Sequence, residues 1–297
     1  MSVNLPTHFV QQYSSNIQLL LAAQGGKFTS KVMMGSHVGK QASPVDQFGA
    51  VEMQLVTSRF APKQRTDAPT DRRWVFPSDY DLNQMVDSFD KLKMITDVNS
   101  TYVVNAVKAA NRQMDRIIIN AFTSTAKTGE NGGTSTIFTA GNEVDVAVGG
   151  ANSKLNVAKL KAVREQMESQ FVDFETEEVY CGLTAADNAS LLNEIQIISS
   201  DFNGGDAVLK DGRVVSFLGF TFCQSQLIEQ LLAGTNEVTL PVWCKSGMYI
   251  GLWEDVQNDV HPRHDIQGDP WEITTTMSAG ATRLEENKVY AIESYRA

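Results

Sequence analysis

The sequence predicts an α+β fold, and three observations support this prediction. Residues 97–124 form a long, uninterrupted helical pattern, and residues 50–57 and 271–284 alternate apolar and polar side chains as strands do. Between residues 177 and 259, short helix and strand patterns are mixed. The chain has 297 residues and 42% hydrophobic content, so it can bury a substantial core as one elaborated domain or as two.

The composition limits the classes of function. The formal charge is -10, which argues against a general nucleic-acid or anionic-membrane binder because clustered Lys and Arg drive phosphate contacts. Three scattered cysteines, Cys181, Cys223 and Cys244, are too few for a disulfide framework. The sequence shows neither a signal peptide nor an apolar run of membrane-spanning length, so we expect no membrane partner.

The chain opens with an amphipathic helical pattern at residues 7–24. Thr7 can cap its start, and Gly25 and Gly26 end it. This pattern needs an apolar partner surface, in the same chain or in a neighbour. Residues 27–47 contain glycine and proline breakers without a clear period, so we expect an extended segment there.

Residues 49–79 predict a long β-hairpin. The segment AVEMQLVT alternates apolar Val51, Met53 and Leu55 with polar residues, and RRWVFP supplies a second short strand. Pro62 and Pro69 lie in the connection, which predicts a loose tip.

The predicted hairpin is basic although the whole chain is acidic. A projecting segment with the opposite charge to its body indicates contact with another copy of that body. The alternative is a solvated loop whose charges maintain solubility. The residues that we expect at an inter-subunit contact are Arg59, Lys63, Arg65, Arg72, Arg73 and Trp74.

The central prediction is the helix at residues 97–124, which follows a mixed polar and apolar stretch at 81–95. Its length would be about 40 Å at the helical rise of 1.5 Å per residue. Lys108, Arg112, Asp115 and Arg116 line the side opposite its apolar stripe. The residues expected in the buried stripe are Val103, Val107, Ala110, Met114, Ile117 and Ala121.

The second half mixes helices and strands. Asn156 can cap a helix whose buried side includes Val157, Met167 and Phe171. Thr184 and Asp187 form a capping pair for a further helix at residues 184–192. Strands are expected around residues 177–183, 214–218, 220–224, 238–243, 248–253, 271–284 and 289–295.

No catalytic constellation stands out in the sequence. His261 and His264, flanked by Asp259 and Asp265, could supply metal ligands, but we interpret this segment as a polar loop. The cysteines lie on or beside apolar strands, where buried packing is favoured over a nucleophilic role. We therefore expect a protein that is not an enzyme and that has no cofactor, bound metal or catalytic residues.

The order of these elements resembles a tailed-phage major capsid protein with the Hong Kong ninety-seven type fold. The lead-in YDLNQMVDSFDKLKMITDVNS, the helix with DRIIINAF and the closing GATRLEENKVYAIE carry this resemblance over nearly the whole chain. In that family the hairpin is the E-loop and the long helix is the spine of the P-domain. The resemblance implies an N-terminal arm at 1–48, an E-loop at 49–79, a P-domain at 80–176, an A-domain at 177–258, and C-terminal strands returning to the P-domain at 259–297.

The resemblance also implies a function. It suggests a structural subunit that assembles as pentamers and hexamers into an icosahedral shell around a double-stranded DNA genome, in the virion and, during assembly, in the host cytoplasm. Expected partners are other copies of the chain, a portal protein, decoration or cement proteins, and packaged DNA contacted weakly and non-specifically. The family's type member carries a long, protease-removed N-terminal scaffolding segment, whereas one helix and a linker precede the hairpin here, so a separate scaffolding protein is expected.

Two alternatives remain open at the level of sequence. An encapsulin-like compartment shell shares the same fold, and a metal-dependent hydrolase would use the His261 segment. The type member also crosslinks a Lys to an Asn; Lys63 lies in the hairpin, but nothing in the sequence identifies its partner, so we do not carry the crosslink over.

Overall fold

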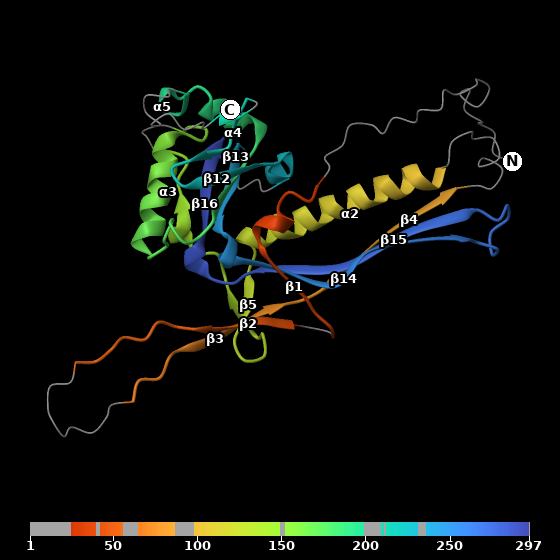
Figure 1. The fold of residues 1–297 in the computed structure, drawn as a ribbon, viewed down its shortest axis with the longest axis horizontal. Coiled ribbons are helices and arrows are strands. Elements are labelled where there is room, and N and C mark those ends of the chain that lie inside the picture. Colours follow the sequence, from red (N-terminus) through yellow and green to blue (C-terminus); the bar gives the residue numbers. More distant parts are fainter. Residues whose placement is uncertain are drawn as a thin grey trace.

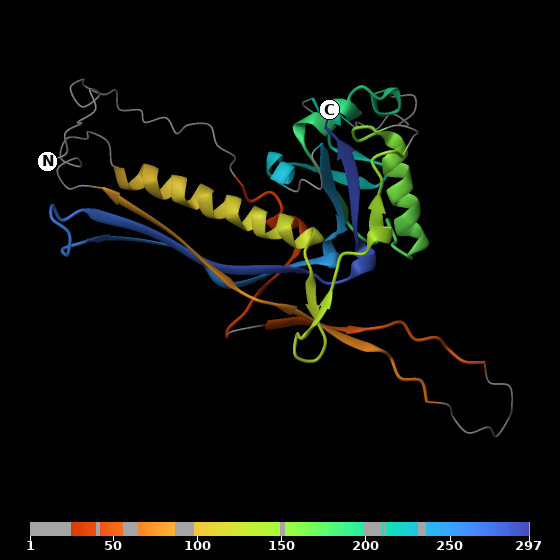
Figure 2. The same ribbon diagram turned by 180° about the vertical axis from the view of Figure 1, so that it is seen from behind.

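The computed structural model confirms the α+β prediction and shows an elongated molecule (Figures 1 and 2). A compact body contains helices α3 (Val157–Ser169) and α4 (Ala185–Leu191). A long arm carries helix α2 (Val98–Thr123) over strands β14 (Met248–Pro262) and β15 (Trp271–Arg283). A hairpin built on β2 (Ala42–Phe48) and β3 (Thr70–Val75) projects away from both. The predicted N-terminal helix, Arg59 and Lys63 lie outside the described residues. The structure describes residues 25–39, 42–55, 65–86, 98–148, 152–198, 209–210, 212–230 and 236–296.

Helix α2 (Val98–Thr123) confirms the long-helix prediction to within a residue at each end. Ala110, Met114 and Ala121 of the expected stripe are buried, whereas Val107 and Ile117 are half-buried. The side chain of Val103 is outside the described residues. Ala110 and Met114 pack against Met277 of the sheet beneath, so this stripe attaches the helix to the arm.

One residue of the expected polar side of α2 is placed differently. Asp115 is 0% exposed. Its carboxylate accepts hydrogen bonds from the backbone N–H groups of Phe28 (3.1 Å) and Lys27 (3.2 Å), which satisfy the buried charge. The segment before the first strand therefore crosses the helix at this point. Further along, Ile118, Ile119 and Phe122 are also buried, so the helix is covered on several sides where it enters the body.

The arm contains a sheet with the order β1-β14-β15-β4. It runs beneath α2, which contacts β14 and β15 (Figure 1). Strand β4 lies at an edge of this sheet and falls mostly in the polar and apolar mixture from which no strand was predicted. Its half-buried residues Tyr80, Leu82 and Gln84 alternate with exposed neighbours. The strands are β1 (Met33–Ser36), β4 (Ser78–Val86), β14 (Met248–Pro262) and β15 (Trp271–Arg283).

The body contains a sheet with the order β11-β12-β8-β13-β16-β7. Central strand β13 pairs antiparallel with both β8 and β16. The strands are β7 (Glu143–Val144), β8 (Val179–Leu183), β11 (Ser216–Phe217), β12 (Phe220–Gln224), β13 (Glu237–Cys244) and β16 (Val289–Tyr295). Strands β9 (Leu209–Lys210) and β10 (Arg213–Val214) pair with each other nearby.

The C-terminal strands do not return to one place. Strand β15 joins the sheet of the arm, but β16 pairs with β13 in the body, so the expected return of residues 259–297 to the P-domain needs revision for β16. The boundary expected after residue 258 also falls within β14. The physical reason is the apolar register of β16, whose residues 289–292 are buried in the body core.

The helices of the body are α3 (Val157–Ser169), α4 (Ala185–Leu191) and α5 (Ile195–Ile198). As predicted, the Asn156 side chain accepts from the Lys159 N–H, and Thr184 accepts from the Asp187 N–H. Phe171, expected on the buried side of α3, is 96% exposed. It lies beyond the end of the helix with φ +64°, so the chain turns away before its side chain can reach the core.

Aromatic side chains form the centre where the arm meets the body. The fully buried Trp243 contacts Phe122 of α2 and Phe28 of the first described segment, with ring centroids 4.7 Å and 5.6 Å apart. Its indole N–H donates to the Lys31 carbonyl at 2.9 Å. The described residues also form short 3-10 turns: η2 (Thr29–Lys31), η3 (Ala140–Asn142), η4 (Gln226–Gln230), η5 (Lys245–Gly247) and η6 (Glu286–Lys288).

The hairpin differs from the prediction in the position of its first strand. Strand β2 (Ala42–Phe48) precedes the predicted segment and pairs with β3 (Thr70–Val75). Strand β3 then pairs with β5 (Ala126–Thr128), and β5 with β6 (Thr134–Thr136). Residues 51–55 extend outward without a strand assignment, so the predicted strand at 50–57 is wrong over this described part. The alternating pattern is real, but no described residue of this chain pairs with it.

Candidate subunit interface

The root of the hairpin separates two neighbouring arginines. Adjacent residues of a strand point to opposite faces, and β3 places Arg72 on one face and Arg73 on the other. The Arg72 side chain is 42% exposed and pairs with Asp46 of β2 at 2.6 Å. Arg73 is 6% exposed and pairs with Glu286, at 3.3 Å.

The Arg72–Asp46 pair links β3 to β2 on the exposed side of the ribbon. The hydrogen bond from Arg72 lowers the pKa of Asp46. The Arg72 guanidinium also lies 5.8 Å from the ring centroid of Trp74. These contacts hold Arg72 within its own chain, so its charge is less available to a neighbour than the sequence suggested.

Arg73 was expected at an inter-subunit contact, but its side chain is buried within its own chain. Its side chain points toward the body, where it meets the carboxylate of Glu286. The same carboxylate also accepts a hydrogen bond from Nε of Arg283 at 2.9 Å. Arg283 is 0% exposed. One carboxylate therefore lies between two buried guanidinium groups, one from the hairpin and one from the end of β15.

Arg283 also reaches the C-terminal end of α2. Its guanidinium donates to the carbonyls of Phe122 (2.8 Å) and Ala121 (3.5 Å), and to that of Ser124. These carbonyls belong to the last turn and exit of the helix, where intrahelical donors are missing and the helix dipole favours a cation. The same arginine thus satisfies the helix end and pairs with Glu286.

Further side-chain contacts fix the hairpin root. Gln47 donates to the Leu284 carbonyl, and its amide oxygen accepts from Nε of Arg73 at 3.4 Å. Trp74 donates from its indole N–H to the Gly129 carbonyl at 2.7 Å. Gly129 has φ +85°, a conformation that favours glycine, in the tight connection between β5 and β6.

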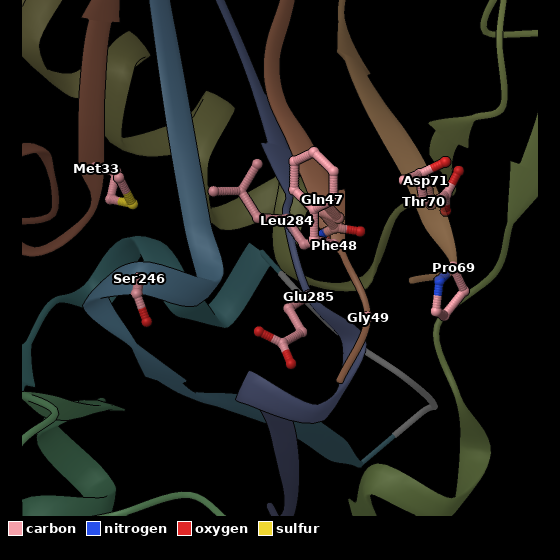
Figure 3. Close-up of a pocket in the computed structure, with 10 residues that line it drawn as sticks. All are labelled: Met33, Gln47, Phe48, Gly49, Pro69, Thr70, Asp71, Ser246, Leu284 and Glu285. Atoms are coloured by element: carbon pink, nitrogen blue, oxygen red, sulfur yellow. The ribbon is translucent and has the colours of Figure 1, made fainter. Parts of the chain in front are cut away.

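A hollow of about 450 Å³ lies beside this root (Figure 3). Figure 3 shows Ser246, Leu284 and Glu285 on the body side, facing Phe48 and Pro69 of the hairpin. Ser246 Oγ bonds to the Glu177 carboxylate at 2.8 Å. The described lining residues include no histidine or cysteine, and the hydroxyl of Ser246 is already bonded to Glu177.

Beyond the root, the hairpin exposes apolar side chains. Val51, Met53 and Leu55 are 52%, 100% and 87% exposed. Arg65 lies on the returning segment and pairs with Asp67 at 2.7 Å, with both side chains largely exposed. A projecting segment that combines apolar side chains with a cation has the composition of an interaction surface rather than of a solvated loop.

The other candidate chemistry does not converge. His261 lies 3.3 Å from both Asp259 and Glu272, and His264 lies 3.3 Å from Asp269. In the described part of the chain, no group of three His, Cys, Asp or Glu side chains is placed to hold a metal ion. No described helix is long and apolar enough to cross a membrane.

The cysteines are buried, as their strand positions predicted. Burial raises the pKa of the Cys181 and Cys223 thiols, and it raises the pKa of Cys244 to about 12. The thiolate form that a nucleophile requires is therefore disfavoured at all three positions.

Sequence reasoning missed the residues that anchor the hairpin: Gln47, Arg283 and Glu286. The closing segment GATRLEENK contains two of them, but a single sequence carries no signal that pairs them with Arg73. Their role follows only from the fold, which brings the end of β15 against the hairpin root.

An elongated α+β chain whose projecting hairpin exposes apolar side chains has the architecture of a subunit that contacts other chains. Sequence comparison then identifies the family. The family model described as phage capsid protein matches residues 5–295, so the chain belongs to the phage capsid protein family. No curated protein matches the chain.

Solved phage capsids share the fold over almost the full length. The capsid of cyanophage P-SCSP1u matches with a TM-score of 0.73 and 16% identity, covering 97% of this chain and 93% of that chain. The capsid of cyanophage Pam1 matches with a TM-score of 0.72 and 10% identity, covering 100% of both. The capsid of Ralstonia phage GP4 gives 0.70 and 11%, covering 97% and 95%. The chain is a structural major capsid protein of the virion shell, not an enzyme, and neither the encapsulin-like nor the hydrolase alternative is favoured.

Proposed function

We propose that the chain assembles as pentamers and hexamers into an icosahedral shell around a double-stranded DNA genome, and that each hairpin lies across the adjacent subunit. The observation that carries this proposal is the exposure of Val51, Met53 and Leu55 on a segment that projects from the body. Alternating apolar residues on such a segment are covered when a second copy packs against them.

Charge supports the same arrangement. Copies with a formal charge of -10 repel one another, and a cationic hairpin laid on an acidic neighbour reduces this repulsion. Among the residues assigned to this contact, Arg65 has the most exposed described side chain, with 85% exposure. Arg59 and Lys63 belong to the same proposal from their sequence positions. Arg72 and Trp74 contribute mainly by shaping the ribbon.

We assign the parts of the chain by their sheets. The arm, with α2 and the β1-β14-β15-β4 sheet, corresponds to the P-domain, and the body sheet that includes β8, β12, β13 and β16 corresponds to the A-domain. The hairpin corresponds to the E-loop, and residues 1–48 to an N-terminal arm whose last strand, β2, forms one side of that loop. The finer partners in this proposal are a separate scaffolding protein, a portal protein, decoration proteins and packaged DNA, with assembly in the host cytoplasm.

The test is the size of the native protein. The chain is expressed alone and together with a scaffolding protein of the same phage, and particles are measured by sedimentation and negative-stain microscopy. We expect pentamers, hexamers or closed shells, because the hairpin cannot bury its apolar side chains within one chain. A strictly monomeric protein at high concentration in both preparations would overturn the proposal.

A further inference from the structure

The short segment 283–286, which we call the junction, joins four parts of the molecule. It begins at the last residue of β15 in the arm and leads through η6 into β16 of the body. Its side chains and carbonyls also contact the end of α2 and the root of the hairpin. A change at any of these four places can therefore reach the others through a few short contacts.

The contact between hairpin and junction has unusual electrostatics. Nη1 of Arg73 and Oε1 of Glu286 are both buried, and neither forms a hydrogen bond within the described residues. Their 3.3 Å ion pair compensates the charge of Arg73, and Glu286 shares its own charge between Arg73 and Arg283. Rotating the hairpin away from the body would separate them in a low-dielectric environment, which is strongly unfavourable.

Glu286 and Arg283 of the junction are also held by hydrogen bonds. Glu286 Oε2 accepts from Arg283 Nε at 2.9 Å, and Arg283 is fixed by the carbonyls at the end of α2. Glu286 therefore cannot follow Arg73 outward without leaving Arg283. The carboxylate has one position that satisfies both guanidinium groups.

We propose that Glu286 is a positioning residue that couples the direction of the hairpin to the C-terminal end of α2. This inference rests on the proposed function, in which the hairpin direction determines where the adjacent subunit sits. With the Arg73–Glu286–Arg283 contacts intact, the hairpin leaves the body at one defined angle. Without them, the hairpin samples a range of angles while the paired strands of its root persist.

The chain provides two matched controls. Arg72 is the neighbour of Arg73 on the opposite face of β3 and pairs within the ribbon, with Asp46. Glu285 precedes Glu286, is half exposed, and lies 3.5 Å from Lys288 rather than beside either arginine. The substitutions Arg72→Gln and Glu285→Gln therefore change the same charge types at adjacent positions without touching the Glu286 contacts.

The experiment measures the hairpin direction in unassembled subunits. Spin labels are placed on Leu55→Cys in the hairpin and Ile195→Cys in the body, both at exposed positions, while the natural cysteines are buried. Distance distributions are recorded by double electron–electron resonance. We expect a narrow distribution in the labelled parent and at least a twofold broader one in Arg73→Gln and Glu286→Gln. Arg72→Gln and Glu285→Gln should match the parent.

A purely stabilising role would lower the melting temperature without broadening the distance distribution, and that result would overturn the inference. If Glu286→Gln does not fold, Arg73→Gln decides the question alone, because it leaves the Glu286–Arg283 pair in place. Arg73→Lys, which keeps the charge, should narrow the distribution again relative to Arg73→Gln. The measurement needs no shell, so failure of the parent to assemble would count against the proposed function and not against this coupling.

Discussion

Arg283 donates a 2.8 Å hydrogen bond to the carbonyl of Phe122, although the two residues are 161 positions apart in the chain. A fully buried cation from the end of β15 thereby satisfies the C-terminal end of the long helix. This contact ties the arm, the body and, through Glu286, the hairpin into one unit.

Replacing Arg283 by Ala should therefore destabilise the fold strongly. The change leaves Glu286 with a single cation and exposes helix-end carbonyls to a cavity, and removing one partner of a buried pair costs about 3–5 kcal/mol. Denaturant unfolding measures this free energy. Arg213→Ala, at an exposed position of β10, is the control and should lie within about 0.5 kcal/mol of the parent. Equal stabilities for the two variants would contradict the role of Arg283.

The continuity of α2 gives a second prediction. Met114→Pro should cost ~3 kcal/mol or more, because proline removes a backbone hydrogen bond and clashes with the preceding turn. Met114→Leu preserves the apolar contact with Met277 and should cost less than about 1.5 kcal/mol. Circular dichroism and sedimentation measure folding and assembly. Assembly-competent Met114→Pro protein would show that an unbroken helix is not required.

A third prediction concerns the pH dependence that Asp187 gives to folding. Burial on its own raises the pKa of Asp187, but hydrogen bonds from Arg296, Ser294 and Thr184 outweigh burial and leave the pKa lowered. Because the folded-state pKa lies below the unfolded value of 3.8, the carboxylate stabilises the fold above pH 3.8. This stabilisation is lost as the pH falls through the lower folded-state pKa.

Asp187→Asn should therefore lower the unfolding free energy by about 3–5 kcal/mol at neutral pH, because Arg296 loses its buried partner. The difference from the parent should shrink as the pH falls below 3.8. Urea unfolding of both proteins across the acid range measures it. A difference that stays constant with pH would assign the effect to packing rather than to charge.

The fourth prediction separates the histidines from function. His261 and His264 pair with carboxylates at the end of β14 and just beyond it, away from the hairpin root. The double substitution His261→Gln and His264→Gln should leave particle yield unchanged, as sedimentation would measure. Metal analysis of the purified parent and variant should give equal contents. Joint loss of bound metal and of particles would restore the metal-site alternative.

The sequence predicts the long helix well because its apolar period and the absence of breakers are local properties. Strand β4 was missed because only Tyr80 and Leu82 supply its apolar half, and the polar Gln84 takes the next half-buried position. The alternation of Val51, Met53 and Leu55 predicted a strand, yet in the single chain these side chains are exposed. An alternating apolar pattern of this kind also suits contact with a second chain. An interpretation that considers one chain alone assigns the pattern to a strand within that chain.

The buried Arg73 shows a different limit. In sequence it is one of five cations in a basic hairpin, and nothing distinguishes it from Arg72. Its partner Glu286 lies near the other end of the chain, so only the fold determines which arginine is buried. Charge counting treated the five cations alike, but Arg72 and Arg73 pair within the chain and are less available to a neighbour.

The last prediction tests the charge of Arg65, the exposed described cation of the hairpin, by itself. Reversing Arg65 and Arg72 together would also break the Arg72–Asp46 pair and place two acids side by side in the ribbon. Arg65→Glu alone changes a residue whose contact with Asp67 is fully surface-exposed, and such pairs contribute only ~0.2–1 kcal/mol. The isolated subunit should therefore fold like the parent by circular dichroism.

Assembly should respond differently from folding. If the hairpin lies on an acidic neighbour, Arg65→Glu replaces an attraction by a repulsion at every copy of the contact, and the loss accumulates over the shell. Salt screens exposed charges beyond about 10 Å at 0.1 M, so the defect should be larger at low ionic strength. Sedimentation at two salt concentrations measures it, with Arg213→Glu as a control for net charge. If Arg65→Glu assembles like that control at both concentrations, the charge of Arg65 does not bind a neighbour, and its assignment to the contact is wrong.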